Sequence, residues 1–446
     1  VRKAPAGTPP GLQAGGTPDV FVGRGAPLNA AALDLRGLVR PGDTVVFGQG
    51  TAEPQTLTEA LVAQRRELGR FTVFLGSGFT DTFLPEHHDS IDFIGFGGIG
   101  THRRLTRAGC LDVIPCHVSQ VPEHIRGGRI GCDVLMIQVS APNERGEYCP
   151  ALANDYLRAA VDSARVVIAE VNSEVPQAHC QQPLVASEID VFVETSRPLI
   201  RLPAAAVGEL ERRVAAHVDE YIVDGATLQV GIGAIPEAIL AQLHTRRDLG
   251  IHSGMIGDSV VELMERGVVT NALKGIDAGV SITGVLFGTE RLYRYAHRNP
   301  ALRICHTAYT HGEETLRQIR NFVSINSALE VDLTGQVNAE CVGRDYVGAV
   351  GGQVDFIRAA ARSEGGVSIV AFPSAAKGGA TSRIVARLSG PVTTARSDVD
   401  VIATEHGAVR LRGLSLRRRV QAMLSIAAPA HREALQQQAD ALAAAA

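Results

Sequence analysis

Residues 43–50 read Asp-Thr-Val-Val-Phe-Gly-Gln-Gly, and residues 226–233 read Ala-Thr-Leu-Gln-Val-Gly-Ile-Gly. Each stretch is an apolar run that ends in a Gly-x-Gly turn. A proline and a helix-like run follow in both places, and the run stops at Gly69 in the first copy and at Gly250 in the second. Strand, glycine turn and helix form the repeating unit of parallel α/β sheets. The two copies therefore predict two related α/β domains.

The alternation of strands and helices continues between and after these copies. Further strand-like runs lie at 71–76, 133–140, 165–171, 281–287, 322–325 and 367–372. A long amphipathic pattern over 205–224 predicts the helix that ends the first domain. We therefore expect a disordered N-terminal tail over residues 1–20, a first domain over 21–224 and a second domain over 225–446.

The composition is that of an ordinary globular protein. Of its 446 residues 45% are hydrophobic and 20% are charged, which suffices for two cores. A net charge of −4 argues against a nucleic-acid partner. The sequence shows neither a membrane-spanning apolar run nor a signal-peptide pattern, so we expect a cytoplasmic protein that does not bind membranes.

The metal-binding and thiol residues carry few signals. Seven cysteines are scattered along the chain without a CxxC pair, which predicts no disulfide and no structural zinc, as in a reducing cytoplasm. The cluster His87-His88-Asp89 lacks a third ligand at a suitable spacing. We expect no metal cofactor.

Three glycine-rich loops are candidate binding loops. The two Gly-x-Gly turns lack the third glycine of a dinucleotide motif, because Glu53 and Pro236 stand there. They favour instead a close approach of the backbone to a ligand or to a neighbouring element. Gly351 and Gly352 can present backbone N–H groups to a developing oxyanion, or can simply form a tight turn.

Lysine is rare in this chain, which makes its positions worth noting. Lys3, Lys274 and Lys377 are the lysines in a total of 43 lysines and arginines. Positions 274 and 377 either need a compact ammonium group or are ordinary surface lysines. The stretch Lys377-Gly378-Gly379 is similar to a phosphate-binding turn.

A series of ordered motifs indicates a family. The motifs are Gly48-Gln-Gly50 with Glu53-Pro54, Gln138-Val-Ser140, Ile168-Ala-Glu-Val-Asn172, Gln229-Val-Gly-Ile-Gly233, Asn326-Ser-Ala-Leu-Glu-Val-Asp-Leu-Thr-Gly-Gln336, Gly351-Gly-Gln-Val-Asp-Phe356 and Pro373-Ser-Ala-Ala-Lys-Gly-Gly379. With them the chain resembles the acetyl-CoA hydrolase/transferase family of class I CoA-transferases over about residues 22–435. Its nearest likeness is to the 4-hydroxybutyrate CoA-transferase branch.

The resemblance implies the fold and the ligands. It implies two related domains with mainly parallel sheets that face a central cleft, an acyl-CoA substrate, a small carboxylate or amine acceptor, and a homodimer. It also implies an oxyanion loop and contacts to coenzyme A at one set of residues. These are Gly351, Gly352, Gln353 and Asp355, and the glycine turns add Gly231, Gly233, Lys377 and Gly378 as candidate contacts to coenzyme A.

One motif departs from the family at its nucleophile. Where relatives have a motif like His-Ser-Glu-Met, this chain reads His252-Ser253-Gly254-Met255. In relatives the glutamate attacks an acyl-CoA and forms an anhydride and then a glutamyl-CoA thioester, and glycine cannot do this. The candidate catalytic residues are accordingly the Gly254 position, His252, Glu330, Gly351 and Gly352.

Three functions stay open at this point. The first is an enzyme that processes acyl-CoA without glutamyl-CoA, by direct acyl transfer, thioester hydrolysis or decarboxylation. The second is a CoA-transferase with another carboxylate nucleophile, namely Asp258, Glu330 or Glu340. The third is a non-catalytic protein that binds acyl-CoA.

Overall fold

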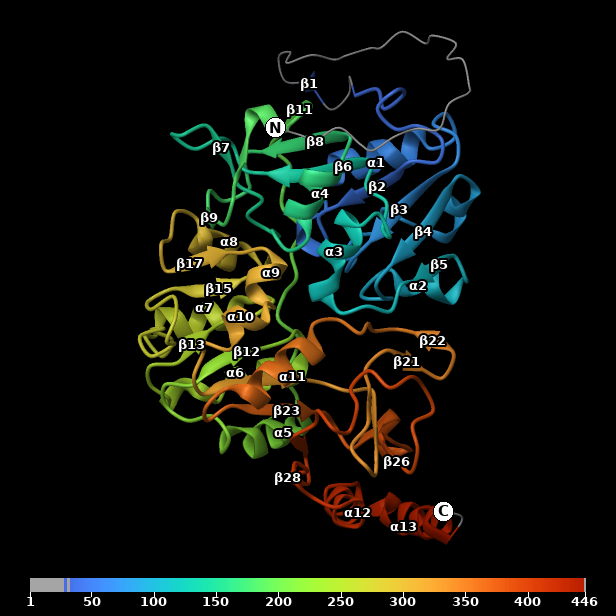
Figure 1. Cartoon of the computed structure of the whole chain (residues 1–446), viewed down its shortest axis with the longest axis vertical. Coiled ribbons are helices and arrows are strands. Elements are labelled where there is room, and N and C mark those ends of the chain that lie inside the picture. The colour runs from blue at the N-terminus through green and yellow to red at the C-terminus, as the bar shows by residue number, and fades with distance from the viewer. Residues whose placement is uncertain (1–27, 30–32, 445–446) are drawn as a thin grey trace.

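The computed structural model describes residues 28, 29 and 33–444, so the predicted tail over 1–20 lies outside the described residues. Its first sheet has the strand order β1-β11-β8-β6-β2-β3-β4-β5, and every neighbouring pair is parallel (Figure 1). The strands are β1 Leu28–Asn29, β2 Thr44–Phe47, β3 Phe71–Leu75, β4 Ile91–Gly95, β5 Leu111–Val113, β6 Val134–Val139, β8 Val166–Asn172 and β11 Val191–Thr195.

The second sheet has the order β13-β12-β18-β23-β27-β28 and is parallel except for the last pair. Its strands are β12 Thr227–Gln229, β13 Gly250–Ile251, β18 Phe322–Asn326, β23 Val367–Ala371, β27 Val401–Thr404 and β28 Gly407–Arg410. The predicted α/β class with mainly parallel sheets is confirmed.

Small sheets fill the connections between the two large ones. Their strands are β7 Glu147–Tyr148, β9 His179–Cys180, β10 Leu184–Val185, β14 Met255–Ile256, β15 Ser281–Thr283, β16 Val285–Leu286, β17 Leu302–Ile304, β19 Glu330–Asp332, β20 Val337–Asn338, β21 Cys341–Val342, β22 Asp345–Tyr346, β24 Ala375–Ala376, β25 Thr381–Ser382 and β26 Ile384–Val385. The predicted strand over 281–287 is therefore two strands, interrupted at Gly284.

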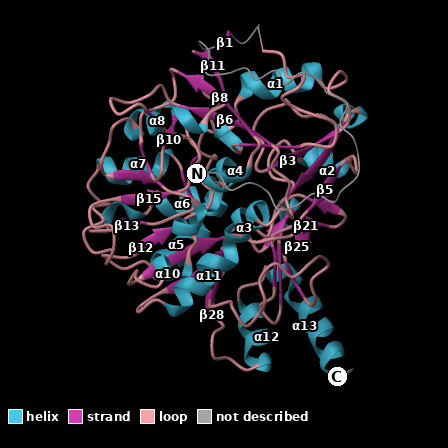
Figure 2. Ribbon diagram, turned by 45° about the horizontal axis from the view of Figure 1, so that its top comes forward, coloured by secondary structure: helices cyan, strands magenta, loops and turns pink. Residues whose placement is uncertain are grey.

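The helices of the first half of the chain are short. They are α1 Gln55–Gln64, α2 Arg103–Arg107, α3 Val121–Arg126, α4 Leu157–Ser163 and α5 Glu209–Asp219. Those of the second half are α6 Ala234–Leu240, α7 Asp258–Glu265, α8 Glu290–Ala296, α9 Thr307–Thr310, α10 Glu313–Leu316, α11 Gln353–Arg362, α12 Leu416–Ser425 and α13 Pro429–Ala444. The last two lie at one end of the molecule (Figure 2). No helix in the described ranges is long and apolar enough to cross a membrane.

The sequence repeat becomes a structural repeat. Strand β2 leads through a glycine turn to α1 and then to its parallel neighbour β3. Strand β12 leads in the same way to α6 and to its parallel neighbour β13. In the repeated unit, alternate side chains enter cores on opposite faces, as Val45 and Val46 do on β2.

The two halves share one core and exchange elements. One cluster of buried side chains contains Val46 of the first sheet and Ile325 of the second. Helix α5, predicted as the end of the first domain, packs against α6 and β27. Strand β9 of the first half pairs with β17 of the second. A domain boundary between residues 224 and 225 stays a prediction.

Cys149 and Cys180 form a disulfide, with their Cα atoms 6.0 Å apart. The prediction that the chain has no disulfide is therefore wrong. The sequence did not reveal the bond because the two cysteines are 31 residues apart. The fold brings Cys180, on β9, next to Cys149, which directly follows β7. The cysteines therefore no longer argue for a reducing compartment. A cytoplasmic location stays a prediction.

The disulfide predicts a thiol count. Alkylation of the denatured protein without reductant should modify five cysteines, namely Cys110, Cys116, Cys132, Cys305 and Cys341. After reduction, the mass of the alkylated chain should correspond to all seven. Seven modified cysteines in unreduced protein would contradict the Cys149–Cys180 bond. The matched control is Cys149→Ser, in which Cys180 loses its partner and six cysteines should be modified without reductant.

Candidate active site

Gly254 lies between β13 and β14 in a segment that backbone hydrogen bonds hold on several sides. The amides of Gly284 and Val285 both donate to the carbonyl oxygen of Gly254, at 3.1 Å each. The hydroxyl of Ser253 donates to the carbonyl oxygen of Val230 at 3.0 Å. Gly254 itself is partly exposed, whereas Ser253 is fully buried. The segment therefore presents position 254 on a fixed backbone.

His252 is buried beneath this segment. Its Nε2 lies 3.2 Å from the carbonyl oxygen of Thr310, which it contacts as an N–H donor. Burial, and then the charge of Lys274, lowers the pKa of His252 to about 3, so the ring is neutral. His252 thus connects β13 to the end of α9, and a catalytic part for it stays a prediction.

An imidazole occupies the space beside Gly254. A Cβ atom built on Gly254 would lie 2.8 Å from Cε1 and 3.0 Å from Nε2 of His311, the residue that follows α9. A Cβ atom built on Gly352 would lie 2.5 Å from the same Nε2. The ring also packs on Phe356, with centroids 4.4 Å apart. Sequence reasoning did not find His311, because no motif marks it.

The glycine-rich loop belongs to the second half of the chain, as Gly254 does, and it accepts hydrogen bonds from the first half. The amide of Gly98 donates to Gly348 at 3.0 Å, and the amide of Val118 donates to Gly351 at 3.0 Å. Gly351 has a φ of +62°, which favours glycine, and Gly352 caps the N-terminus of α11. The fold thus brings the loop with Gly351 and Gly352 close to Gly254, because Gly352 and Gly254 flank the same ring of His311. The family resemblance implied that these residues share a site, and the spacing of the motifs alone did not.

Gln353 and Asp355 fix the start of α11. The Nε2 of Gln353 donates to the hydroxyl of Thr394 at 3.1 Å, and Asp355 accepts a bond from the hydroxyl of Ser119 at 2.9 Å. Burial raises the pKa of Asp355. Gln353 and Asp355, both predicted to contact coenzyme A, therefore form hydrogen bonds with other side chains of the protein at the start of α11.

The second Gly-x-Gly turn lies next to Ser253. The turn begins at Val230, whose carbonyl oxygen accepts the bond from Ser253, and it ends at Gly233, which has a φ of +119°. No heavy atom lies within 4 Å of a Cβ atom built on Gly231 or Gly233. The turn therefore borders open space near the candidate site, as a binding loop requires.

The three alternative carboxylates are hydrogen-bonded elsewhere. Glu330 accepts bonds from Asn338, Ser389 and Gly390, at 3.1, 2.7 and 3.1 Å. The carboxylates of Asp258 and Glu340 also accept hydrogen bonds from nearby groups. Asp258 accepts from the amides of Thr289 and Leu292, and Glu340 accepts from the hydroxyls of Tyr346 and Thr393. All three carboxylates hold turns in place, and within the described residues no hydrogen bond joins them to Gly254.

Lys377 and Gly378 lie in the exposed turn between β24 and β25. The carbonyl oxygen of the next residue, Gly379, contacts Nε2 of His431 at 2.8 Å, on the side of α13. No described contact brings this turn to Gly254. A role for Lys377 and Gly378 in binding coenzyme A stays a prediction.

Lys274 is buried under the candidate site. Its Nζ donates to the carbonyl oxygens of Ile251 and Val280, at 2.9 and 2.8 Å, and 1% of the residue is exposed. Burial lowers the pKa of Lys274 to about 8. The lysine therefore fits the expectation of a compact ammonium group at this position, where it supports the strand that leads to Gly254.

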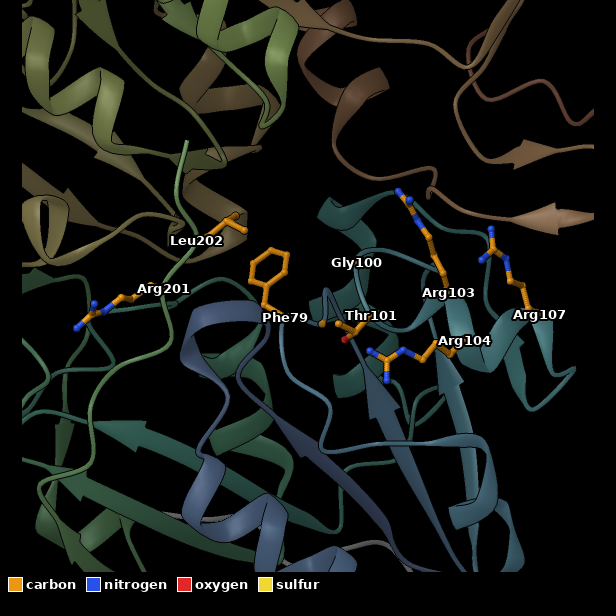
Figure 3. A pocket seen from close by; sticks show the side chains of 9 residues that line it. Phe79, Gly100, Thr101, Arg103, Arg104, Arg107, Arg201 and Leu202 are labelled. Atoms are coloured by element: carbon orange, nitrogen blue, oxygen red, sulfur yellow. The ribbon is translucent and has the colours of Figure 1, made fainter. Parts of the chain in front are cut away.

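A pocket of about 420 Å³ is lined by residues of the first half of the chain (Figure 3). Arg103, Arg104 and Arg107 of α2 form one wall, and Phe79 and Leu202 form the other. Arg103 donates to the carbonyl oxygen of Val347, just before the glycine-rich loop, at 3.2 Å. Phe79 packs on Phe287, with centroids 4.9 Å apart. Two of these guanidinium groups are ion-paired within the protein, Arg104 with Asp81 and Arg107 with Asp345.

Two family models match this chain. The model described as the acetyl-CoA hydrolase/transferase N-terminal domain matches residues 30–199, and the corresponding C-terminal domain matches residues 288–439. The chain belongs to the acetyl-CoA hydrolase/transferase family. The two matched regions contain the two large sheets except β1, β12 and β13, so the match also supports the two-domain architecture.

Curated members of the family are similar over nearly the whole chain. The 4-hydroxybutyrate coenzyme A transferase of Clostridium kluyveri is 40% identical, over 88% of this chain and 92% of its own length. The butyryl-CoA:acetate CoA-transferase of Anaerostipes caccae is 31% identical, over 89% of this chain and 92% of its own.

Solved structures of the family have the same fold. RipA from Yersinia pestis is 33% identical and superposes with a TM-score of 0.86, over 91% of this chain and 95% of its own. A 4-hydroxybutyrate CoA-transferase from Porphyromonas gingivalis is 35% identical with a TM-score of 0.76, over 90% of this chain and 94% of its own.

The packing of His311 predicts a cost for any side chain at position 254. We expect Gly254→Ala to lower the free energy of unfolding by about 1–3 kcal/mol, because the new methyl group overlaps the imidazole. In a His311→Ala background the same change should cost much less, which a double-mutant cycle by urea unfolding would measure. Gly231→Ala, which meets open space, is the control. Equal costs at positions 254 and 231 would contradict the overlap.

Lys274 predicts a pH dependence of stability. Its pKa is about 8 in the folded protein against a usual 10.5, so between these values the unfolded chain holds a proton that the folded protein has lost. Folding therefore gains stability as the pH rises through this window, by roughly 3 kcal/mol. We expect the unfolding free energy of wild type relative to Lys274→Met to rise between pH 7.5 and pH 10. A difference that stays constant with pH would contradict the burial of a titrating ammonium.

Proposed function

We propose that this protein transfers coenzyme A between a short acyl-CoA and a small carboxylic acid. The observation that carries the proposal is the 40% identity to a 4-hydroxybutyrate coenzyme A transferase over 88% of the chain. A second relative acts, by its name, on butyryl-CoA and acetate. Both names describe transfer between carboxylic acids, which favours transfer over hydrolysis or decarboxylation for this chain.

The site supplies what attack on a thioester needs. The carbonyl oxygen of the thioester gains negative charge in the transition state and is stabilised by N–H groups that are already oriented. The amides of Gln353 and Val354, in the first turn of α11, have no acceptor among the described residues. We propose that these amides and those of Gly351 and Gly352 bind that oxygen.

The route to the product differs from that of glutamate-dependent relatives. Glycine at position 254 provides no carboxylate, and Asp258, Glu330 and Glu340 are hydrogen-bonded to turns away from it. We therefore propose transfer without a glutamyl-CoA intermediate. The homodimer that the resemblance implies belongs to the same proposal. A small amine would accept the acyl group and not coenzyme A, so an amine acceptor is an alternative to this proposal.

Product analysis tests the proposed reaction. The full chain is incubated with acetyl-, butyryl- or 4-hydroxybutyryl-CoA and a ¹³C-labelled carboxylic acid, and the CoA esters are measured by mass spectrometry. We expect a labelled CoA ester to form while the total of thioesters stays constant. Samples without the acid are the control for hydrolysis.

Other products would identify the other functions. Free CoA in an amount equal to the lost thioester would mean hydrolysis. Loss of CO2 from a dicarboxylic acyl-CoA such as malonyl-CoA, incubated in a parallel sample, would mean decarboxylation. An amide formed in the presence of an amine would mean acyl transfer. Tight binding of the acyl-CoA by calorimetry without any turnover would mean a binding protein, and each of these results contradicts coenzyme A transfer.

A further inference from the structure

The space beside Gly254 is not empty, because the imidazole of His311 fills it. The ring atoms Cε1 and Nε2 lie 2.8 and 3.0 Å from the position that a Cβ atom at 254 would take. A glutamate side chain at 254 would have to start at that point. The chain therefore lacks the carboxylate but holds a nitrogen base and nucleophile in the same space.

The orientation of the ring is fixed. Its Nδ1 lies 2.8 Å from the hydroxyl of Thr310, and its face packs on Phe356. The backbone of Thr310 is fixed in turn, because its carbonyl oxygen contacts the ring of His252. His252 of the family motif thus positions the residue that precedes His311.

The Nε2 atom is the free end of this ring. Only 9% of His311 is exposed, and its Nε2 has no hydrogen-bond partner among the described residues. A Cβ atom on Gly352 would lie 2.5 Å from it, so Nε2 points at the glycine that caps α11. An unpaired nitrogen on a largely buried ring, at the N-terminus of a ten-residue helix with free first-turn amides, is arranged to meet a polarised carbonyl group.

We infer that His311 is the catalytic nucleophile of this site, a role that rests on the proposed coenzyme A transfer and specifies how it occurs. With the ring proton on Nδ1, the lone pair of Nε2 attacks the thioester carbonyl carbon while the amides of α11 bind its oxygen. The C–S bond breaks and its electron pair leaves with the CoA thiolate. The product is an acyl-imidazolium on His311.

Two further steps complete the transfer without any other reagent. The carboxylate of the acceptor attacks the acyl carbon, which breaks the C–N bond, returns its electron pair to Nε2 and forms a mixed anhydride. The CoA thiolate then attacks the acceptor's carbonyl carbon of the anhydride, and the donor acid leaves as its carboxylate. One thioester and one carboxylate enter, one of each leaves, and the imidazole is restored.

The surroundings of the ring favour this use of it. Burial lowers the pKa of His311 to about 3, so Nε2 keeps its lone pair at neutral pH. Position 254 carries no side chain that would block the approach to Nε2, and Gly352 carries none on the other side. The two glycines and the histidine form one unit.

Isotope exchange tests the acyl-enzyme. The full chain is incubated with acetyl-CoA and deuterated CoA in the absence of any carboxylic acid, and the label in acetyl-CoA is measured by mass spectrometry. An acyl-imidazole returns its acyl group to either CoA, so we expect exchange. Direct attack of the acceptor on the thioester gives no exchange without an acceptor.

Variants assign the exchange to His311. His311→Gln should lower the rates of exchange and of transfer by at least about 100-fold, as loss of a nucleophile does. His88→Gln, a change at an exposed histidine, should keep both rates. The role of His311 is overturned if His311→Gln exchanges the label at the wild-type rate, or if the wild type shows transfer but no exchange. Either result leaves the proposed transfer intact.

The remaining outcomes separate the two proposals. Exchange without transfer supports the nucleophile and overturns the proposed function, and the absence of both overturns both. If His311→Gln does not fold, Gly254→Glu combined with His311→Ala decides. We expect that double variant to transfer coenzyme A through a carboxylate, and Gly254→Glu alone to lose the wild-type transfer because its side chain and His311 compete for the same space. If Gly254→Glu is equally active with and without the His311 side chain, the two side chains do not compete for the same space.

Discussion

Position 254 and the side chain of His311 cannot both be large, and much of the site depends on this exclusion. The imidazole lies within contact distance of both Gly254 and Gly352, so the two glycines and the ring form one packed unit. The backbone at 254 has no freedom to move away, because two amides bind its carbonyl oxygen. Any side chain at position 254 would therefore compete with the imidazole of His311 for the same volume.

Burial keeps the two histidines of this site uncharged. Two neutral imidazoles, His252 and His311, lie one on each side of Thr310, and burial keeps both uncharged. The nearest buried cation, Lys274, bonds to the carbonyl oxygens of Ile251 and Val280 and points away from the open side. The site therefore relies on backbone dipoles, which suits a reaction whose charge appears only in the transition state.

Much of the fold follows from sequence patterns, and much of the site does not. Strands β2 and β12 and their glycine turns could be predicted because a buried parallel strand is a short apolar run. The family motifs located Gly254 and the Gly351-Gly352 loop. His311 could not be predicted, because it reaches the site from the end of a four-residue helix with no pattern of its own. The bonds that hold Glu330, Glu340 and Asp258 in turns depend equally on distant partners.

The shared core has a consequence for the chain as a whole. Buried side chains from both large sheets belong to one cluster, α5 packs on the second sheet, and β9 joins a sheet of the other half. Cutting the chain between the halves would expose to water an apolar face on each fragment and an unpaired strand edge at β17. Each half of the chain therefore completes the core of the other, and we expect neither half to fold as an independent protein.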